Sequence, residues 1–383
     1  MKKGELMAES TRGTMVLSLD LELSWGRFDK VPVEVLGAES LAERQEIKRF
    51  LALLDQYEMP ATWAMVGHLM LDGCARDCKG HAHAETMPHA QYSWYPRDWY
   101  SCDPCTNVSL APGWYGPDIL EWIRAAKVRH EIGSHSFAHI LFGDPGCSVS
   151  SAEADIKAAM EAAASKGITL NSFVFPRNRV GHLETLKRLG LSAYRGDAPA
   201  VGKVYGLALK PLNLLRQVLA LPMEPVRPEE TLPGLWNIPE SHFFLARKGI
   251  RKILPRGSQA LRAKRSIDMA VRTGRLYHMW FHPFDLLTDS DAMFSGLETV
   301  FAHARRLREK GLLDVLTMGD YARRLDRETY GVPPEPGDRG KALTKGNRRT
   351  KGPLDARISA QPILDRVMTV PHVIPQVRCK GAS

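Results

Sequence analysis

The segment MVLSLDLE, residues 15–22, is a short apolar run that ends in two acidic residues. Its composition and its turn-like flanks predict a buried strand. Asp20 and Glu22 lie two residues apart at the carboxyl end, and because side chains alternate along a strand, both should point to the same side. Two such carboxylates can divide the chemistry, one binding a metal ion and the other moving a proton. A strand that ends in acids can equally be a solvated edge.

Further segments of this kind follow, and amphipathic helical patterns lie between them. We expect strands over 15–21, 61–66, 130–134, 172–175, 193–195, 235–238, 276–281 and 314–317, and helices over 42–57, 117–126, 152–165, 182–189, 212–221, 259–273 and 297–310. Alternating strands and helices predict an α/β fold around a parallel sheet. About eight such units over roughly 320 residues favour a distorted (β/α)7-8 barrel, with its chemistry at the carboxyl ends of the strands.

The domain boundaries follow from where this alternation stops. We expect the barrel to occupy 14–330, with an irregular insertion over 72–116, between a disordered 1–13 and a basic, largely disordered tail over 331–383. Ten Lys/Arg against four Asp/Glu after residue 332 account for six of the nine net positive charges. The body therefore carries no nucleic-acid surface, and the tail allows at most a weak contact with an anionic membrane. The oligomeric state is left open.

The start of the chain lacks the continuous apolar stretch of a signal peptide, and no window reaches the length of a membrane span. We therefore expect a cytoplasmic protein. Six cysteines in 383 residues do not resemble a disulfide framework, so reduced thiols are expected.

Two histidines follow the strand expected near residue 132. In HEIGSHSFAH, residues 130–139, His135 and His139 are four apart, which would place both imidazoles on one face if the chain turned helical there. With a carboxylate from another strand they would form a two-histidine, one-carboxylate metal set with positions left for water and substrate. The spacing alone is common by chance, but beside Asp20 and Glu22 it favours a metal centre.

A third histidine ends the strand expected over 276–281. His282 follows an apolar run and precedes a proline in HMWFHP, residues 278–283. It can be a capping residue, or a general acid that protonates a leaving amine, because a histidine titrates near neutral pH.

Taken in order, Asp-x-Glu, His-Ser-x-x-His, Phe-Pro-Arg and a late strand ending in histidine resemble the polysaccharide deacetylases, the NodB-homology or carbohydrate esterase family 4 group, over about residues 14–325. The resemblance implies a barrel of that type and a divalent metal, most often zinc. It also implies removal of N-acetyl groups from amino sugars.

The resemblance also implies roles for individual residues. Asp20 matches the general base, Glu22, His135 and His139 match the metal ligands, and His282 matches the late catalytic histidine. The usual first motif has adjacent aspartates, whereas here the second acid is displaced by one residue and is glutamate. In the third motif Val174 stands where the family has an arginine, so Arg177, after Pro176, is the catalytic candidate for orienting Asp20.

The expected function is therefore metal-dependent hydrolysis of an N-acetylated amino sugar or glycan, in surface polysaccharide metabolism. The alternatives are a hydrolase of a cyclic amide or formamide, and a barrel that binds glycans or acts as a scaffold without catalysis.

The insertion carries two further patterns. Cys74, Cys78, Cys102 and Cys105 form either a second zinc site or free thiols. Its aromatic residues, and Trp25 and Trp280 outside it, either stack on a sugar ring or pack the protein; those in the insertion are Tyr92, Trp94, Tyr95, Trp99, Tyr100, Trp114 and Tyr115.

Overall fold

The computed structural model describes residues 12–77, 80, 82–83, 89–197 and 210–331, which fall in two compact units, Met1–Asp326 and Arg327–Ser383. The barrel described below belongs to the first unit. The terminus expected to be disordered is described only at residues 12–13, and the basic tail only at Gly331. Cys78 also lies outside the described residues.

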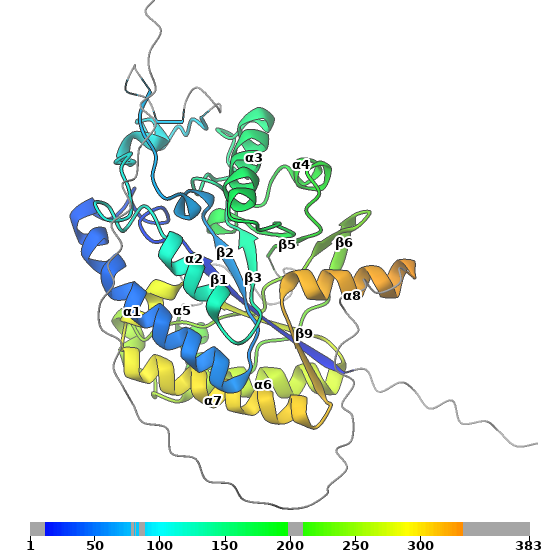
Figure 1. The fold of residues 1–383 in the computed structure, drawn as a ribbon. Coiled ribbons are helices and arrows are strands. Elements are labelled where there is room, and N and C mark those ends of the chain that lie inside the picture. The colour runs from blue at the N-terminus through cyan, green and yellow to red at the C-terminus, as the bar shows by residue number, and fades with distance from the viewer. Residues whose placement is uncertain (1–11, 78–79, 81, 84–88, 198–209, 332–383) are drawn as a thin grey trace, which may run out of the picture. The chain divides into compact units, whose positions relative to one another are not determined.

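The strands form one sheet that is almost entirely parallel (Figure 1). They are β1 (Gly13–Leu21), β2 (Thr62–Met65), β3 (Glu131–Ser134), β4 (Ser172–Val174), β5 (Ala193–Arg195), β6 (Glu229–Leu232), β7 (Leu235–Asn237), β8 (His242–Phe243), β9 (Leu276–Phe281) and β10 (Leu313–Leu316). Their order is β6-β7-β5-β4-β3-β2-β1-β9-β8, and β10 pairs with the first half of β1. All eight strands expected from the sequence are present, within two residues at each end.

The sheet closes on itself through the chain from β7 to β8. β7 pairs with β5, and five residues further along β8 pairs with β9. Backbone hydrogen bonds continue along this connection, from the N–H of Glu240 to the carbonyl of Gly196 and from the N–H of Ser241 to the carbonyl of His278. The result is a distorted α/β barrel, as expected. β8 was not predicted because two residues carry no periodicity of their own.

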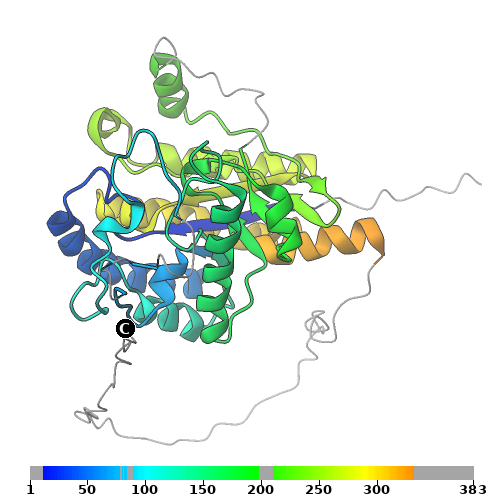
Figure 2. The same ribbon diagram turned by 90° about the horizontal axis from the view of Figure 1, so that it is seen from above.

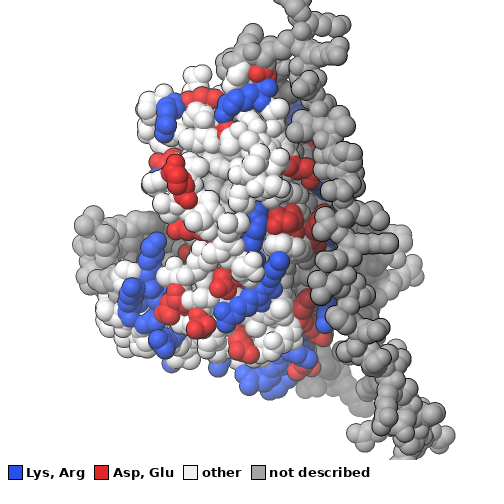
Figure 3. All heavy atoms as spheres, turned by 60° about the vertical axis from the view of Figure 1, so that its left-hand side comes forward, with Lys and Arg blue, Asp and Glu red and all other residues white. Residues whose placement is uncertain are grey.

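Helices cover the outside of the barrel, as Figures 1 and 2 show. They are α1 (Val33–Tyr57), α2 (Pro117–Ala125), α3 (Val149–Ser165), α4 (Leu183–Arg188), α5 (Lys210–Val218), α6 (Ser258–Thr273), α7 (Ser290–Glu309) and α8 (Met318–Tyr330). α1, α6 and α7 pack side by side, and α3 lies beside α4. Among the described residues no helix has the length and apolarity needed to cross a membrane. The face shown in Figure 3 carries interspersed charges of both signs.

The insertion of 72–116 packs around its own aromatic side chains. Trp99 lies 4.7 Å from Phe28 and 5.3 Å from Tyr95 between ring centroids, and Trp25 lies 4.9 Å from Trp114. Of the insertion's seven aromatic residues only Trp94 is exposed, at 44%. Local packing therefore accounts for the others, and for the fully buried Trp25.

Candidate active site

The carboxyl end of β1 delivers both acidic residues into the mouth of the barrel. Asp20 lies within the strand, Glu22 follows its last residue, and both are buried. The chain then turns at Leu23, whose φ of 48° ends the extended conformation. Gly26 packs directly against the Glu22 carboxylate, where a Cβ atom would overlap it. The two carboxylates are thus held on one side of the strand, as alternation predicts.

His135 and His139 come together through a loop, so the helical turn that was considered for their spacing is absent here. Ser136 and His139 have positive φ values of 69° and 58°, which no α-helix tolerates. Asp155 of α3 holds this loop by accepting hydrogen bonds from the Ser136 hydroxyl at 3.0 Å and the Phe137 N–H at 2.8 Å. The two imidazoles consequently lie 5.0 Å apart between ring centroids.

One oxygen of Glu22 lies between the two imidazoles. Its Oε1 is 3.1 Å from Nε2 of His135 and 3.1 Å from Nε2 of His139. His135 donates its Nδ1–H to the carbonyl of Val174 at 2.8 Å, which leaves Nε2 as a bare acceptor facing a carboxylate unless the ring carries an extra proton. A cation between them removes that conflict. Ligand atoms about 2.0–2.2 Å from one ion stand about 3.0–3.6 Å apart, depending on the coordination angle, so these three residues fit a divalent metal.

The charge of Glu22 suits this role. Burial raises the pKa of its carboxyl group, but the neighbouring imidazoles of His282, His139 and His135 outweigh burial and hold the pKa well below its ordinary value. Glu22 is therefore an ionised carboxylate, as a metal ligand must be.

Asp20 is bound by a different arginine from the one expected. Arg195, the last residue of β5, donates from Nη1 to Oδ1 at 2.7 Å and from Nη2 to Oδ2 at 2.6 Å. Burial raises the pKa of Asp20, but this guanidinium outweighs it and keeps the pKa below its ordinary value. Arg177 instead pairs with Asp29 at 2.5 Å. Its φ of 52° turns the chain after Pro176, and its catalytic role remains a prediction.

A short network supports Arg195 from below. Its Nη1 also donates to the hydroxyl of Ser18 at 3.0 Å, and that hydroxyl lies 2.8 Å from Nε2 of His278. The guanidinium carbon stands 4.0 Å from the centre of the Trp280 ring, a cation–π contact. Trp280 therefore packs the wall beside the site.

His282 stands at the open side of the site. Its Nε2 is 3.6 Å from Oε1 of Glu22 and 4.0 Å from Oδ2 of Asp20, and its side chain is 20% exposed while theirs are nearly buried. Its Nδ1 lies 3.3 Å from Oδ2 of Asp285, and Phe284 stacks on the ring at 4.6 Å. Burial lowers the pKa of His282, but the charge of Glu22 and the hydrogen bond with Asp285 raise it to about 9. The ring can therefore donate a proton at neutral pH.

A buried acid lies behind Glu22. Glu43 of α1 is 1% exposed, and neither of its oxygens has a hydrogen-bond partner in the part of the chain that the structure describes. Burial raises its pKa to about 8, against the attraction of Arg27. It is therefore a neutral carboxylic acid at neutral pH.

Arg195, Asp155 and Asp285 were not singled out from the sequence. The sequence pattern could have indicated Arg195, because it is a charged residue that ends an apolar strand at the edge where the site residues gather. Asp155 is one acid among several polar residues of an amphipathic helix, so nothing in the local pattern distinguishes it.

No protein-family model and no curated protein sequence matches this chain. Among solved structures, the chain is similar to a Mycobacterium smegmatis protein described as a polysaccharide deacetylase, with 12% identity, a TM-score of 0.51, and 88% and 97% of the two chains covered.

Two further matches have lower TM-scores. A 4-alpha-glucanotransferase from Thermococcus litoralis gives 0.45, with 11% identity over 82% of this chain and 40% of that one. A family 4 acetyl xylan esterase from Clostridium thermocellum, solved with a cobalt ion, gives 0.36, with 14% identity over 84% and 93%. On the first of the three similarities, and on the barrel described above, this chain has the fold of the polysaccharide deacetylases.

Proposed function

We propose that this chain is a metal-dependent hydrolase that removes the N-acetyl group from an amino sugar or glycan. The observation that carries the proposal is the convergence of Glu22, His135 and His139 on one point, with Asp20 and His282 beside it. The three-residue set matches catalytic zinc sites, which use three protein ligands and keep a position open. Zinc is therefore the proposed metal.

The chemistry of amide hydrolysis can be divided among these residues. A divalent cation on Glu22, His135 and His139 would supply positive charge that polarises the amide carbonyl and acidifies a water molecule. Asp20, ionised and fixed by Arg195, accepts the proton of the attacking water. The two hydrogen bonds of Arg195 fix the carboxylate's orientation, and they lower its basicity at the same time.

His282 is the general acid of the proposal. It lies across Glu22 and Asp20 on the partly exposed side, from which a substrate would enter. Asp285 orients the ring through Nδ1 and leaves the Nε2 proton directed toward the site. That proton would pass to the amine nitrogen as the bond between carbon and nitrogen breaks, so the products are acetate and a free amino sugar.

The choice of an acetylated sugar is supported by the structural neighbour from Mycobacterium smegmatis, which is described as a polysaccharide deacetylase. A role in surface polysaccharide metabolism, which the family resemblance implies, and a cytoplasmic location are part of the same proposal. Hydrolysis is favoured over a scaffold role because an ionised base, Asp20, and a protonated acid, His282, face the same site.

The proposal is tested with a substrate panel. Acetate release is measured from N-acetylglucosamine, its short β-linked oligomers and a nucleotide-linked N-acetylamino sugar, and ring opening is measured on cyclic amides. We expect the wild type to release acetate, and Asp20→Asn and His282→Gln to release none. Turnover of the cyclic amides alone, or sugar binding without turnover, would contradict it.

A further inference from the structure

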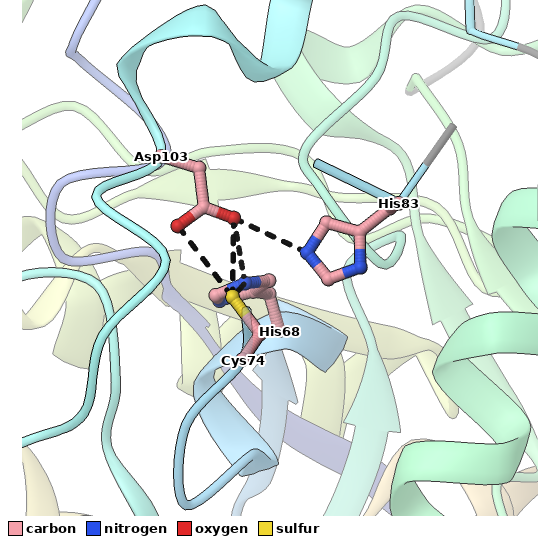
Figure 4. A group of neighbouring side chains, drawn as sticks. All are labelled: His68, Cys74, His83 and Asp103. Atoms are coloured by element: carbon pink, nitrogen blue, oxygen red, sulfur yellow. Dashed lines mark hydrogen bonds and ion pairs between the residues drawn. The ribbon is translucent and has the colours of Figure 1, made fainter. Parts of the chain in front are cut away.

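A second group of ligand-type side chains lies in the insertion, away from the active site. His68 belongs to the short helix η1 (Gly67–Met70) after β2, and Cys74 and His83 follow within the insertion. Asp103 comes directly after the short helix η2 (Trp99–Cys102). Figure 4 shows the Asp103 carboxylate facing the other three side chains, with contacts to each of them. Of the cysteine set considered in the sequence, Cys74 is the only described member that belongs to this group.

The distances between these ligand atoms fit tetrahedral coordination of one metal ion. Oδ2 of Asp103 lies 3.0 Å from Nε2 of His68, 3.2 Å from Nε2 of His83 and 3.6 Å from Sγ of Cys74. Sγ of Cys74 is 3.6 Å from Nε2 of His68. Zinc bonds of about 2.0–2.3 Å in a tetrahedron place neighbouring ligand atoms about 3.3–3.6 Å apart. The observed separations need only small adjustments to accept the ion.

The hydrogen bonds behind the ligands point the correct atoms inward. Nδ1 of His68 donates to the carbonyl of Trp114 at 3.0 Å, so Nε2 of a neutral ring offers a lone pair to the centre. The hydroxyl of Tyr115 already accepts from the Thr106 N–H at 2.8 Å, and it lies 3.1 Å from Sγ of Cys74, where it can donate to a thiolate. The side chains of His68 and Asp103 are fully buried. A neutral His68 therefore faces the buried carboxylate with a bare nitrogen, and a cation between them removes that conflict.

An ion has a route to this group. His83 and Phe137 line an open hollow of about 640 Å³ whose other wall is α3. The side chain of His83 is 14% exposed and Cys74 is also partly exposed, so solvent reaches the group at these two ligands.

We infer that His68, Cys74, His83 and Asp103 form a second, structural zinc site that fastens the insertion to the barrel. A site closed by four protein ligands has no position for substrate, and mixed imidazole and thiolate ligands select zinc. The ion would join η1 to both ends of the insertion, where Gly73 already pairs with Asn107. η1 in turn supports the loop of the active-site histidines, through hydrogen bonds from Gly67 to Ser136 and from His68 to Phe137, both 2.8 Å long.

Metal content separates this site from the active site. The full chain is purified with zinc, passed through gel filtration and analysed by mass spectrometry in the wild type, Cys74→Ser, His83→Ala, Cys102→Ser and His135→Ala. Cys74→Ser and His83→Ala should each lose one zinc per chain, whereas Cys102→Ser, a thiol of the same insertion outside the group, should lose none. His135→Ala should lose a different zinc if the proposed function is correct, so the two proposals fail independently.

Cobalt supplies a signal that only the thiolate site can give. Cobalt-loaded wild type and His135→Ala should both show thiolate-to-cobalt charge-transfer absorption in the near ultraviolet, and Cys74→Ser should not. If Cys74→Ser fails to fold, zinc-edge absorption on wild type and His135→Ala replaces it, with a sulfur neighbour expected at about 2.3 Å. No sulfur signal in His135→Ala, or a disulfide between Cys74 and Cys105 in the purified chain, would overturn the inference.

Discussion

Arg195 and Asp20 form a bidentate ion pair inside the barrel, with hydrogen bonds of 2.7 and 2.6 Å between two nearly buried side chains. The pair joins the end of β5 to the end of β1 across the barrel. It fixes both oxygens of the proposed base, and it assigns to Arg195 the orienting role that the sequence suggested for Arg177.

Replacement of Arg195 by lysine should therefore disable catalysis while keeping the positive charge. An ammonium group cannot donate the two parallel hydrogen bonds of the guanidinium, so Asp20 would be free to rotate. We expect kcat/KM for acetate release to fall on the order of 10²-fold, within the usual contribution of a positioned base. Removal of the charge altogether would leave Asp20 buried and unpaired, at a cost of about 3–5 kcal/mol in the free energy of unfolding.

Arg177→Lys is the matched control, since Arg177 pairs with Asp29 and not with Asp20. Its effect on kcat/KM should be clearly smaller than that of Arg195→Lys. Equal losses in both variants would show that the guanidinium on Asp20 is not what orients the base.

Gly26→Ala should weaken metal binding at the active site. The added methyl group overlaps the Glu22 carboxylate, so Glu22 must move away from His135 and His139. We expect an affinity loss of about 10–100-fold, as for changes that misplace a ligand. Competition with a zinc chelator measures it. Gly37→Ala is the control, because a Cβ atom there meets nothing within 4 Å; a matching loss in that variant would refute the explanation.

Asp285→Asn should shift the pH dependence of the reaction. The charge of Glu22, followed by the hydrogen bond and charge of Asp285, raises the pKa of His282 to about 9, and a general acid works only while protonated. Without that charge, the alkaline limb of kcat/KM should move to lower pH by about one pH unit. Asparagine keeps an acceptor for the N–H of His282, so the local backbone is preserved. An unchanged alkaline limb would remove His282 from the role of acid.

The metal-free Glu43→Gln variant should be more stable than the wild type, by a margin that grows as the pH rises. The folded chain keeps Glu43 protonated up to a pKa of about 8, whereas the unfolded chain ionises it from about 4.5. Between these two pKa values Glu43 holds its proton in the folded chain but not in the unfolded chain. The free energy of unfolding of the wild type therefore falls as the pH rises through this range, by up to about 1.4 kcal/mol per pH unit. Glutamine has no such titration.

The melting temperature is measured from pH 5 to 9 in wild type, Glu43→Gln and Glu34→Gln, an exposed position on the same helix. The advantage of Glu43→Gln over wild type should grow up to about pH 8, while Glu34→Gln should follow the wild type. A constant difference across the range would mean that Glu43 is already ionised in the folded chain.

The sequence predicted the strands of the barrel well because each is a short apolar run between turns. It predicted the start of α1 nine residues late, at 42 instead of Val33, because the first turns expose Val33 and Val35 and so lack an apolar face. It missed α8, whose composition is mostly polar.

For the candidate site, the sequence predicted which residues meet but not how they meet. The spacing of His135 and His139 suggested a helix, whereas the structure uses two left-handed residues and the support of Asp155, a contact between distant segments. The second metal group shows the same limit. Its members come from four places along the chain, and only their packing around Asp103 brings them together.

The most direct test of the account is a zinc titration of the chelator-treated chain, with acetate release from N-acetylglucosamine oligomers as the readout, in wild type and Glu22→Gln. The account expects no release without metal, a rise with added zinc in the wild type, and no rise in Glu22→Gln. Release that is unaffected by chelation, or equal rises in both proteins, would contradict a metal-dependent hydrolase built on Glu22, His135 and His139.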